Sequence, residues 1–397
     1  MDVSSPGYSA ADALRSNGPE PVRQALVAAR GRTLALAEAY AHALAPAGMR
    51  VPYEPTLNPP LWEWGHVGWF QEYWLARNGQ RSSGVACEPE HARAASLLPG
   101  ADALYDSGRV AHRSRWELAL PSPAATREYL AATLDQTLEL LASLPPDAGD
   151  ADLYFFRLAA LHEEMHAEAA IYMARALALP LGAQPQAPPL NDRGATLRVP
   201  AQKFSLGYAG PGFAFDNELG AHPVQLQAFE IDAQPVSWSR FMPFVEAGGY
   251  GQREWWSGEG WAWLQSAECK PPAGESATGP AIHLNAHEAQ AWCRWSGRRL
   301  PTEAEWECAA LTLPGFSWGG VWEWTASSFL PYPGFSPHPY RDYSAPWFGT
   351  RRVLRGACDA TSPSLAHPRY RNFFEAHRKD VFAGFRSCAL TMTQVRL

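Results

Sequence analysis

Apolar residues in the N-terminal half of the chain recur at helical spacing, three to four residues apart. This pattern predicts helices over 22–44, from Pro60 through Trp74, over 124–144 and over 154–179. Pro59 and Pro60 suit the start of a helix, because the N–H that proline lacks would be unpaired in the first turn. Four long helices with apolar stripes predict an antiparallel bundle, a fold whose facing helices can hold metal sites.

The pattern changes beyond the fourth helix. Residues 180–193 are rich in Pro, Gly, Ala and Gln, which is typical of a linker. Residues 196–200 and 204–208 resemble short strands, and 224–232 alternates with a period of two. One helix is indicated at 285–295, while Gly, Pro and Trp interrupt the remainder, where we expect little regular structure.

These patterns predict two domains, an all-α four-helix bundle over 1–182 and an α+β domain with long loops over 183–397. The 397 residues, 46% hydrophobic and 18% charged, are enough for two globular cores. A net charge of −7 without a basic run argues against nucleic-acid binding. No apolar stretch has the length of a membrane span. Six scattered cysteines and the lack of a signal-peptide pattern favour a cytoplasmic protein with reduced thiols. The oligomeric state stays open.

His162 and His166 carry the first chemical signal. They lie four residues apart on a predicted helix, so both imidazoles share one face and can bind one metal ion. Glu168 follows two residues later, and we expect it to brace the site from its edge. Pairs with this spacing also occur on ordinary surface helices, so the pair alone leaves both interpretations open.

His66 is the best candidate for a third ligand, since a working site needs about three protein ligands and an open position. It lies on an aromatic, apolar helix that should face the bundle interior, and Gly65 and Gly68 would let a backbone or a ligand approach. A core histidine without a metal is the alternative. Three neutral imidazoles suit Fe(II), Zn(II) or Cu(II), and spacing does not choose among them. The other histidines of this half are interpreted as surface or loop residues: His42, His91 and His112.

Several motifs of the second half coincide with these histidines. They are Gly-Arg-Arg-Leu-Pro-Thr-Glu-Ala-Glu-Trp-Glu at 297–307, Val-Trp-Glu-Trp-Thr at 321–325, Val-Leu-Arg-Gly at 353–356, Tyr-Arg-Asn-Phe-Phe at 370–374 and Gly-Phe-Arg at 384–386. With Pro-Pro-Leu-Trp-x-x-Gly-His at 59–66, the order resembles that of the ergothioneine sulfoxide synthase family. Members join a DinB-like bundle to a domain like the formylglycine-generating enzyme, with a C-type-lectin-like fold.

The resemblance implies a mononuclear non-haem iron enzyme. Family members use O2 to join a sulfur or selenium donor to the imidazole C2 of hercynine, which is Nα-trimethylhistidine. The matching ligands are His66, His162 and His166. Three imidazole nitrogens leave open metal positions for O2 and both substrates, and binding them together removes the entropic barrier of assembly.

Met165 is a departure from the pattern of the sulfur-using members of the family. The resemblance implies that those members have Gln directly before the second histidine of the helical motif, where it contacts the substrate. Those members also carry an Arg-rich segment for the carboxylates of a cysteine-type donor, and residues 105–116 have arginines in a different pattern. A neutral, hydroxyl-rich selenosugar would need fewer cationic groups. We therefore favour the selenoneine synthase branch, with ergothioneine-type synthesis from cysteine or γ-glutamylcysteine as the alternative.

The family's substrate-binding motif falls on 370–374, which includes Arg371. Asn372 could hydrogen-bond the carboxylate of hercynine, while Phe373 and Phe374 could pack on its trimethylammonium group, which offers no N–H. Phe374 stands where some relatives have Asp. The alternative is that these aromatic residues belong to an ordinary core.

A tyrosine in the loop after the Trp-Glu-Trp-Thr motif serves the family as a proton donor during O2 reduction. This loop offers Tyr340, Tyr343 and Tyr332, and we favour Tyr340, then Tyr343. Three glutamates of the 297–307 motif are interpreted as hydrogen-bonding scaffold: Glu303, Glu305 and Glu307.

Three other classes compete with this interpretation. A formylglycine-generating oxidase needs a copper-binding cysteine pair, and Cys358 and Cys388 do not occupy its positions. A zinc-dependent thiol transferase of the DinB type could use the same histidines but leaves the second domain without a role. A non-catalytic binding protein would have no need of the complete ligand set.

Overall fold

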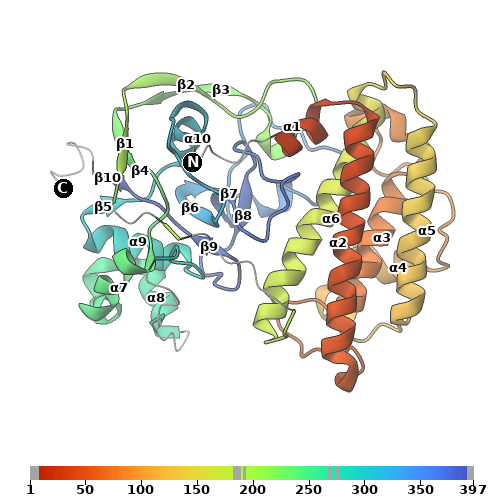
Figure 1. The fold of residues 1–397 in the computed structure, drawn as a ribbon, viewed down its shortest axis with the longest axis horizontal. Coiled ribbons are helices and arrows are strands. Elements are labelled where there is room, and N and C mark those ends of the chain that lie inside the picture. Colours follow the sequence, from red (N-terminus) through yellow and green to blue (C-terminus); the bar gives the residue numbers. More distant parts are fainter. Residues whose placement is uncertain (1–8, 182–188, 191–193, 267–270, 273–277, 391–397) are drawn as a thin grey trace.

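The computed structural model describes residues 9–181, 189–190, 194–266, 271–272 and 278–390. The helical half stands to one side of the molecule and the mixed half to the other (Figure 1). The helices of the first half are α1 (Ser9–Ser16), α2 (Pro19–Leu44), α3 (Pro60–Trp74), α4 (Ala101–Tyr105), α5 (Pro123–Ala142) and α6 (Asp150–Ala176).

The long helices α2, α3, α5 and α6 form the predicted bundle. Each begins where local chemistry favours it: Pro60 occupies the first turn of α3, and the Ser122 side chain accepts a hydrogen bond from the Ala125 N–H at the start of α5. Helix α3 is buried on nearly every side, since only Leu61 and Tyr73 among its residues are partly exposed. It is therefore the central element of the bundle.

Gly65 and Gly68 have a different role from the predicted one. A Cβ atom on Gly65 would lie 2.1 Å from the Tyr105 ring, and one on Gly68 would lie 3.1 Å from the Tyr129 ring. The two glycines thus make room for aromatic side chains of neighbouring segments rather than for a backbone or a ligand.

The second half is an α+β domain, as expected. Its helices are α7 (Trp238–Glu246), α8 (Gly258–Ser266), α9 (Ala286–Trp295) and α10 (Glu303–Thr312). Its strands are β1 (Thr196–Val199), β2 (Gln202–Leu206), β3 (His222–Leu226), β4 (Phe229–Asp232), β5 (Arg298–Arg299), β6 (Val321–Ser328), β7 (Arg352–Ala357), β8 (Asn372–Phe374), β9 (Ala383–Gly384) and β10 (Cys388–Ala389). Within the described residues they form sheets ordered β1-β4-β10-β5, β2-β3 and β8-β7-β6-β9.

The segment 224–232 is two strands, and the prediction of one strand was wrong. β3 pairs with β2, whereas β4 pairs with β1 and β10. The alternation changes phase at Ala228 and Phe229, which are both apolar, and the two halves of the segment find partners in different sheets. Pairing partners are a tertiary choice that alternation does not reveal.

The expectation of little regular structure around α9 was also wrong, because α7, α8, α10, β6 and β7 lie there. Helix α10 starts with a capping box in which Thr302 and Glu305 bond to each other's backbone N–H. Helix α7 contains Pro243, a residue that normally argues against a helix. Buried tryptophans supply the packing that holds such short elements.

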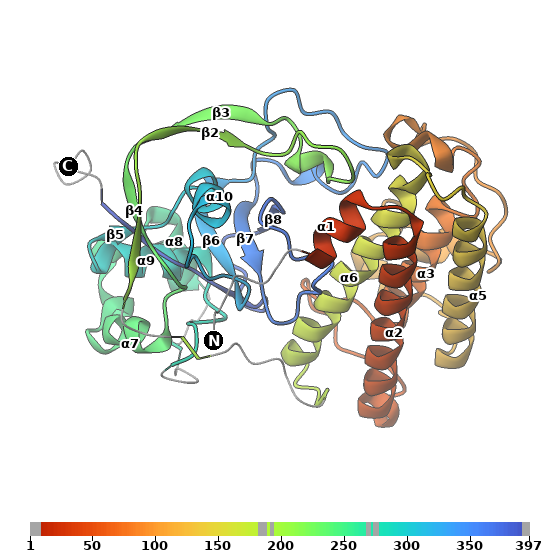
Figure 2. The same ribbon diagram turned by 45° about the horizontal axis from the view of Figure 1, so that its top comes forward.

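One hydrophobic core runs through both halves, from Leu14 and Trp62 in the bundle to Trp322 and Phe385 in the second domain. Helix α6 and the short α1 face the second domain along this boundary (Figure 2). The boundary predicted at residues 182 and 183, and most of the predicted linker, lie outside the described residues. In the described part of the chain, each helix is too short or too polar to cross a bilayer.

Candidate metal centre and substrate site

Three histidines from two bundle helices meet at one point. Helix α3 provides His66, and helix α6 provides His162 and His166. Ligand atoms of all three lie within 4.8 Å of one another. His66 and His162 are buried, while the His166 side chain is 23% exposed. The fold therefore brings together the three residues that the sequence singled out as ligands.

Two of the imidazoles have their second nitrogen fixed by an acceptor. The His66 Nδ1–H donates to the Tyr105 carbonyl oxygen at 2.8 Å, and the His166 Nδ1–H donates to a carboxylate oxygen of Glu63. The Nε2 atoms of His66 and His166 then keep their free lone pairs. The Nε2 atoms of His162 and His166 are 3.2 Å apart. These two nitrogens lie within hydrogen-bond distance of each other, and the convergence of the three rings also suits a cation bound between them.

Burial keeps the His66 and His162 imidazoles of the cluster neutral. It lowers the pKa of His66 to about 3, with further lowering by His166, and it lowers the pKa of His162 well below the ordinary value. Glu63 is also buried, which opposes ionisation, but His166 outweighs this effect and the pKa of Glu63 is about 2. The neutral His66 and His162 imidazoles, with the ionised Glu63 carboxylate close by, suit the donor set and support that a divalent metal requires.

Glu63 was not recognised from the sequence, whereas Glu168 was given the wrong role. Glu63 lies three residues before His66 on α3, and an acid one turn from a ligand is the signal that could have identified it. The Glu168 carboxylate accepts hydrogen bonds from Trp322 Nε1 at 2.6 Å and Thr361 Oγ1 at 2.7 Å, both in the second domain. Glu168 therefore joins the domains rather than bracing the histidines.

The loop after β6 brings Tyr340 against the cluster. Its ring centroid lies 6.0 Å from that of His162 and 4.9 Å from that of Phe70, and Phe70 stacks on His162 at 3.6 Å. Burial raises the pKa of Tyr340, so the phenol keeps its proton. The third tyrosine of the loop, Tyr332, donates to the Glu303 carboxylate at 2.9 Å and belongs to the scaffold.

Tyr343 and Met165 are connected through Tyr370. The Tyr343 hydroxyl donates to the Tyr370 hydroxyl at 3.1 Å, and the Tyr370 hydroxyl donates to the Met165 sulfur at 3.2 Å. The Tyr343 ring stacks on Phe215 with centroids 4.4 Å apart. Met165 lies on α6 between the two histidine ligand candidates. This series of contacts brings the second domain directly to the helix that carries His162 and His166.

Strand β8 carries the remaining predicted substrate residues. Asn372, Phe373 and Phe374 are all partly exposed. Phe373 stacks on Phe329 at 4.0 Å, and the Arg378 guanidinium lies 5.1 Å from the centre of the Phe374 ring. The Phe374 ring therefore already packs against one cation.

Arg371 has little capacity left for a substrate. It is buried, and its guanidinium donates to both oxygens of Glu303 and to two backbone carbonyl oxygens, those of Asn217 and Leu330. Glu307 accepts one hydrogen bond from Arg355 at 2.9 Å, and Glu305 caps α10. These contacts agree with a scaffold role for the glutamates, and they give Arg371 the same role.

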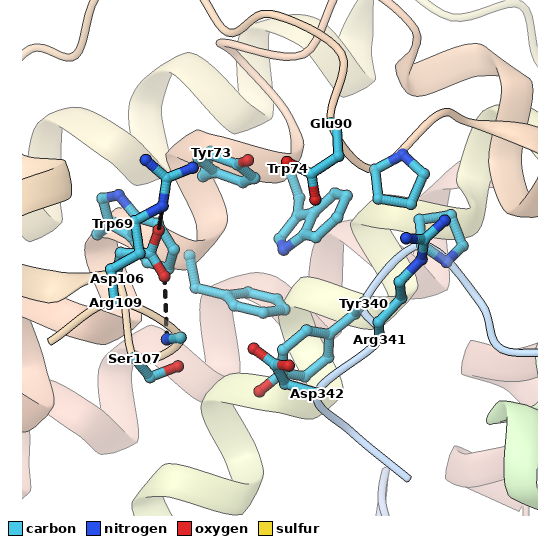
Figure 3. A pocket seen from close by; sticks show the side chains of 14 residues that line it. Trp69, Tyr73, Trp74, Glu90, Asp106, Ser107, Arg109, Tyr340, Arg341 and Asp342 are labelled. Carbon is cyan, nitrogen blue, oxygen red and sulfur yellow. Dashed lines mark hydrogen bonds and ion pairs between the residues drawn. The ribbon is translucent and has the colours of Figure 1, made fainter. Parts of the chain in front are cut away.

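A cavity of about 350 Å³ lies beside the cluster (Figure 3). Phe70 and Tyr340 form part of its wall, and both contact the His162 ring. Other walls come from the aromatic faces of α3 and from the loops around 89–90, 106–109 and 341–342. Charged groups surround it, namely Glu90, Asp106, Arg109, Arg341 and Asp342.

Comparison with known families agrees with this architecture. Residues 25–174 match the DinB superfamily, and residues 183–318 and 316–391 match the Sulfatase-modifying factor enzyme 1-like domain. The chain is 32% identical to a hercynine oxygenase of Mycobacterium tuberculosis over 93% of this chain and 98% of that protein. The hercynine oxygenase of Mycolicibacterium smegmatis is also 32% identical, over 92% of this chain and 98% of its own length. A formylglycine-generating enzyme of Streptomyces coelicolor is 28% identical over 47% of this chain and 84% of its own.

Fold and site together define a two-domain protein in which a DinB-type bundle presents three converging histidines to a domain of the sulfatase-modifying-factor type. The chain belongs to the hercynine oxygenase family. This finding confirms the family resemblance indicated by the motifs.

Proposed function

We propose that this chain is an O2-dependent, non-haem Fe(II) enzyme that joins the imidazole C2 of hercynine to the selenium of a selenosugar. The observation that carries the proposal is the convergence of His66, His162 and His166 beside tyrosines of the second domain, in a member of the hercynine oxygenase family. These three residues would hold the iron. Bound Fe(II) would activate O2, while the electrons that reduce O2 would come from the substrates, since the C2–H bond of hercynine and the Se–H bond of the donor are replaced by a C–Se bond.

The protein's own contribution is orientation and proton supply. Tyr340 lies against the His162 ring and keeps its phenolic proton, so it can donate that proton where O2 is reduced. Phe70, stacked on His162, shields the same side from water. These positions favour Tyr340 over Tyr343, whose hydroxyl is already bonded to Tyr370.

We assign the hercynine side of the site to the region of β8 and of Tyr370, which precedes this strand and whose hydroxyl donates to Met165. A quaternary ammonium binds to aromatic faces, and Phe373 and Phe374 supply such faces on a partly exposed strand. The side-chain amide of Asn372 can donate to the hercynine carboxylate. Met165 cannot hydrogen-bond an imidazole as Gln does, because its thioether is only a weak acceptor.

We propose that the cavity in Figure 3 receives the donor. Its rim carries three carboxylates and two guanidinium groups, and Arg109 is paired with Asp106 at 3.2 Å. With three carboxylates against two guanidinium groups, the rim carries a net negative charge, which disfavours a donor with two carboxylates such as γ-glutamylcysteine. It suits a neutral polyhydroxyl compound, whose O–H groups donate to carboxylates and whose C–H face packs on Trp or Tyr rings.

The alternative is a sulfur donor, as in ergothioneine-type synthesis. The relation to hercynine oxygenases favours hercynine as acceptor but does not distinguish sulfur from selenium. The zinc-dependent thiol transferase would leave the second domain, and the contact of Tyr340 with the cluster, without a function.

A donor competition experiment tests the proposal. Protein purified without O2 and loaded with Fe(II) should bind about one iron per chain, since the cluster has ligands for one ion. With hercynine, O2 and equal amounts of a selenosugar, cysteine and γ-glutamylcysteine, mass spectrometry should detect a C–Se product. The same protein loaded with Zn(II) is the control and should give none.

Products formed only from the two thiols would replace the selenium assignment with the sulfur alternative. If the protein retained its iron but formed no product from any donor, the proposed modification of hercynine itself would be wrong.

A further inference from the structure

Arg115 lies in the short 3-10 helix His112–Trp116, and its side chain reaches back toward the helix that carries His66. One guanidinium nitrogen donates to the Asn58 side-chain oxygen at 2.8 Å, and another donates to the Val110 carbonyl at 3.4 Å. The guanidinium also lies 3.7 Å from the centre of the Trp62 ring. These contacts fix the group in a single orientation.

The stacking contact continues to a histidine of the cluster. The Trp62 and His66 rings are parallel to within 8°, with centroids 4.9 Å apart. The indole nitrogen of Trp62 is tied to the Leu104 carbonyl at 2.8 Å, and His66 itself is tied to Tyr105. Arg115, Trp62 and His66 therefore form a stack whose middle member cannot rotate.

A series of hydrogen bonds leads from Arg115 through Asn58 to a second histidine of the cluster. The Asn58 amide donates to one carboxylate oxygen of Glu63, and the other oxygen accepts from His166 Nδ1. The residues of this series belong to the loop before α3, to α3 itself and to α6. Arg115 thus reaches His66 by stacking and His166 by hydrogen bonds, over two separate routes.

We propose that Arg115 is a positioning residue that sets the ring orientation of His66 and His166 toward a common metal ion. The inference rests on the proposed metal site. Partners behind the ligands commonly account for roughly 10- to 100-fold in metal affinity, because they fix the tautomer and the ring plane. His162 is outside both routes, since Phe70 holds its ring by stacking.

The chain supplies a matched control. Arg113 lies two residues away in the same 3-10 helix, is exposed, and has its guanidinium 5.3 Å from the centre of the exposed Tyr53 ring. Arg113→Gln removes the same charge from the same helix without touching either route. Any effect shared by Arg113→Gln and Arg115→Gln is therefore a general effect of charge.

The test measures Co(II) binding to metal-free full-length protein, followed by titration and by the visible absorption bands of the bound ion. Arg115→Gln should weaken Co(II) binding by roughly 10-fold or more and shift those bands, because two ligands lose their fixed planes. Asn58→Ala, which breaks one route only, should give a smaller loss in the same direction. Combining the two changes should add little to Arg115→Gln, and Arg113→Gln should match the unchanged protein.

Unchanged Co(II) affinity and spectrum in both Arg115→Gln and Asn58→Ala, with normal thermal unfolding, would overturn the proposal. A raised KM for the donor with unaltered Co(II) binding would also overturn it, because Arg115 would then contact substrate. The His162→Ala variant distinguishes a wrong role for Arg115 from a wrong assignment of the metal site. If His162→Ala still bound one Co(II) with the original affinity, the three-histidine centre itself would be absent.

Discussion

The partner of Nδ1 is the residue-level feature that distinguishes His66 and His166 from ordinary core histidines. In each ring this nitrogen meets an acceptor, Tyr105 O or the Glu63 carboxylate, so the Nε2 lone pair points toward the cluster. In His166 this Nε2 lies 3.2 Å from Nε2 of His162. The ring orientations, and not only the positions, are therefore those expected of candidate metal ligands.

Tyr340 and Tyr343 can be distinguished by single substitutions. Tyr340→Phe should lower kcat by roughly 100-fold while KM for hercynine changes little, because it removes a proton donor and leaves the ring packed against Phe70. Tyr343→Phe loses the hydrogen bond to Tyr370 and should cost less, about fivefold, a typical effect of about 1 kcal/mol. Steady-state product formation measured alongside O2 consumption checks both. The opposite order of effects would assign the proton donor to Tyr343.

At the level of elements, α3 combines three functions: it carries His66, supports His166 through Glu63, and packs on all sides. Gly65 and Gly68 make this packing possible, because α4 and α5 place Tyr105 and Tyr129 directly against them. Tyr105 in turn supplies the carbonyl that fixes His66. Packing and ligand orientation in this helix are therefore coupled.

Gly65→Ala should destabilise the fold and disturb the metal centre. The new Cβ atom would lie 2.1 Å from the buried Tyr105 ring, and overpacking of this kind costs about 1–3 kcal/mol. Gly31→Ala in α2 is the matched control, because no atom lies within 4 Å of its Cβ position, and it should stabilise by about 0.5–1 kcal/mol. Urea unfolding measures both changes. Equal stability of the two variants would contradict the close packing of α3 against Tyr105.

For the molecule as a whole, the interface between domains is part of the site. Buried ion pairing of Arg15 with Glu218 at 2.6 Å and the hydrogen bonds of Glu168 join the bundle to the second domain. Tyr340 reaches the His162 ring, and Tyr370 reaches Met165 on the same helix, only because this interface is closed. A shared core predicts that the two domains unfold in one cooperative transition.

His338 gives this interface a pH dependence. The Tyr154 hydroxyl on α6 donates to His338 Nδ1 at 3.0 Å, and burial lowers the pKa of His338 from 6.5 to about 4. Between these two pKa values the unfolded chain binds more protons than the folded chain. The contribution of His338 to the free energy of unfolding is therefore fully present above pH 6.5 and is lost as the pH drops toward about 4. His338→Gln, which keeps an acceptor, should reduce this loss by ~1–3 kcal/mol.

Thermal unfolding between pH 7.5 and 5 measures the effect. His42→Gln is the control, because it removes an exposed histidine from α2 and should leave the pH dependence of Tm as it is. The same fall in Tm with pH for His338→Gln and the unchanged protein would show that His338 is not the group responsible.

Local patterns in the sequence were sufficient for the bundle helices, for the α+β character of the second half and for the three histidines. Helical spacing and the i, i+4 rule act over a few residues, so His162 and His166 had to share a face once their helix formed. The motifs located Tyr340 and Tyr343 in a loop, and the family match supports that framework.

Only the tertiary structure decided the pairing of 224–232 in two sheets, the role of Glu168, and the links from Arg115 to His66 and His166. These contacts join residues far apart in the chain: Glu63 and His166 are separated by 103 positions, and Glu168 and Trp322 by 154. Neither periodicity nor spacing carries information over such distances, because the partner of a side chain depends on how whole elements pack. The sequence was enough to identify the three candidate ligands, and the packing determined the orientation of each ring.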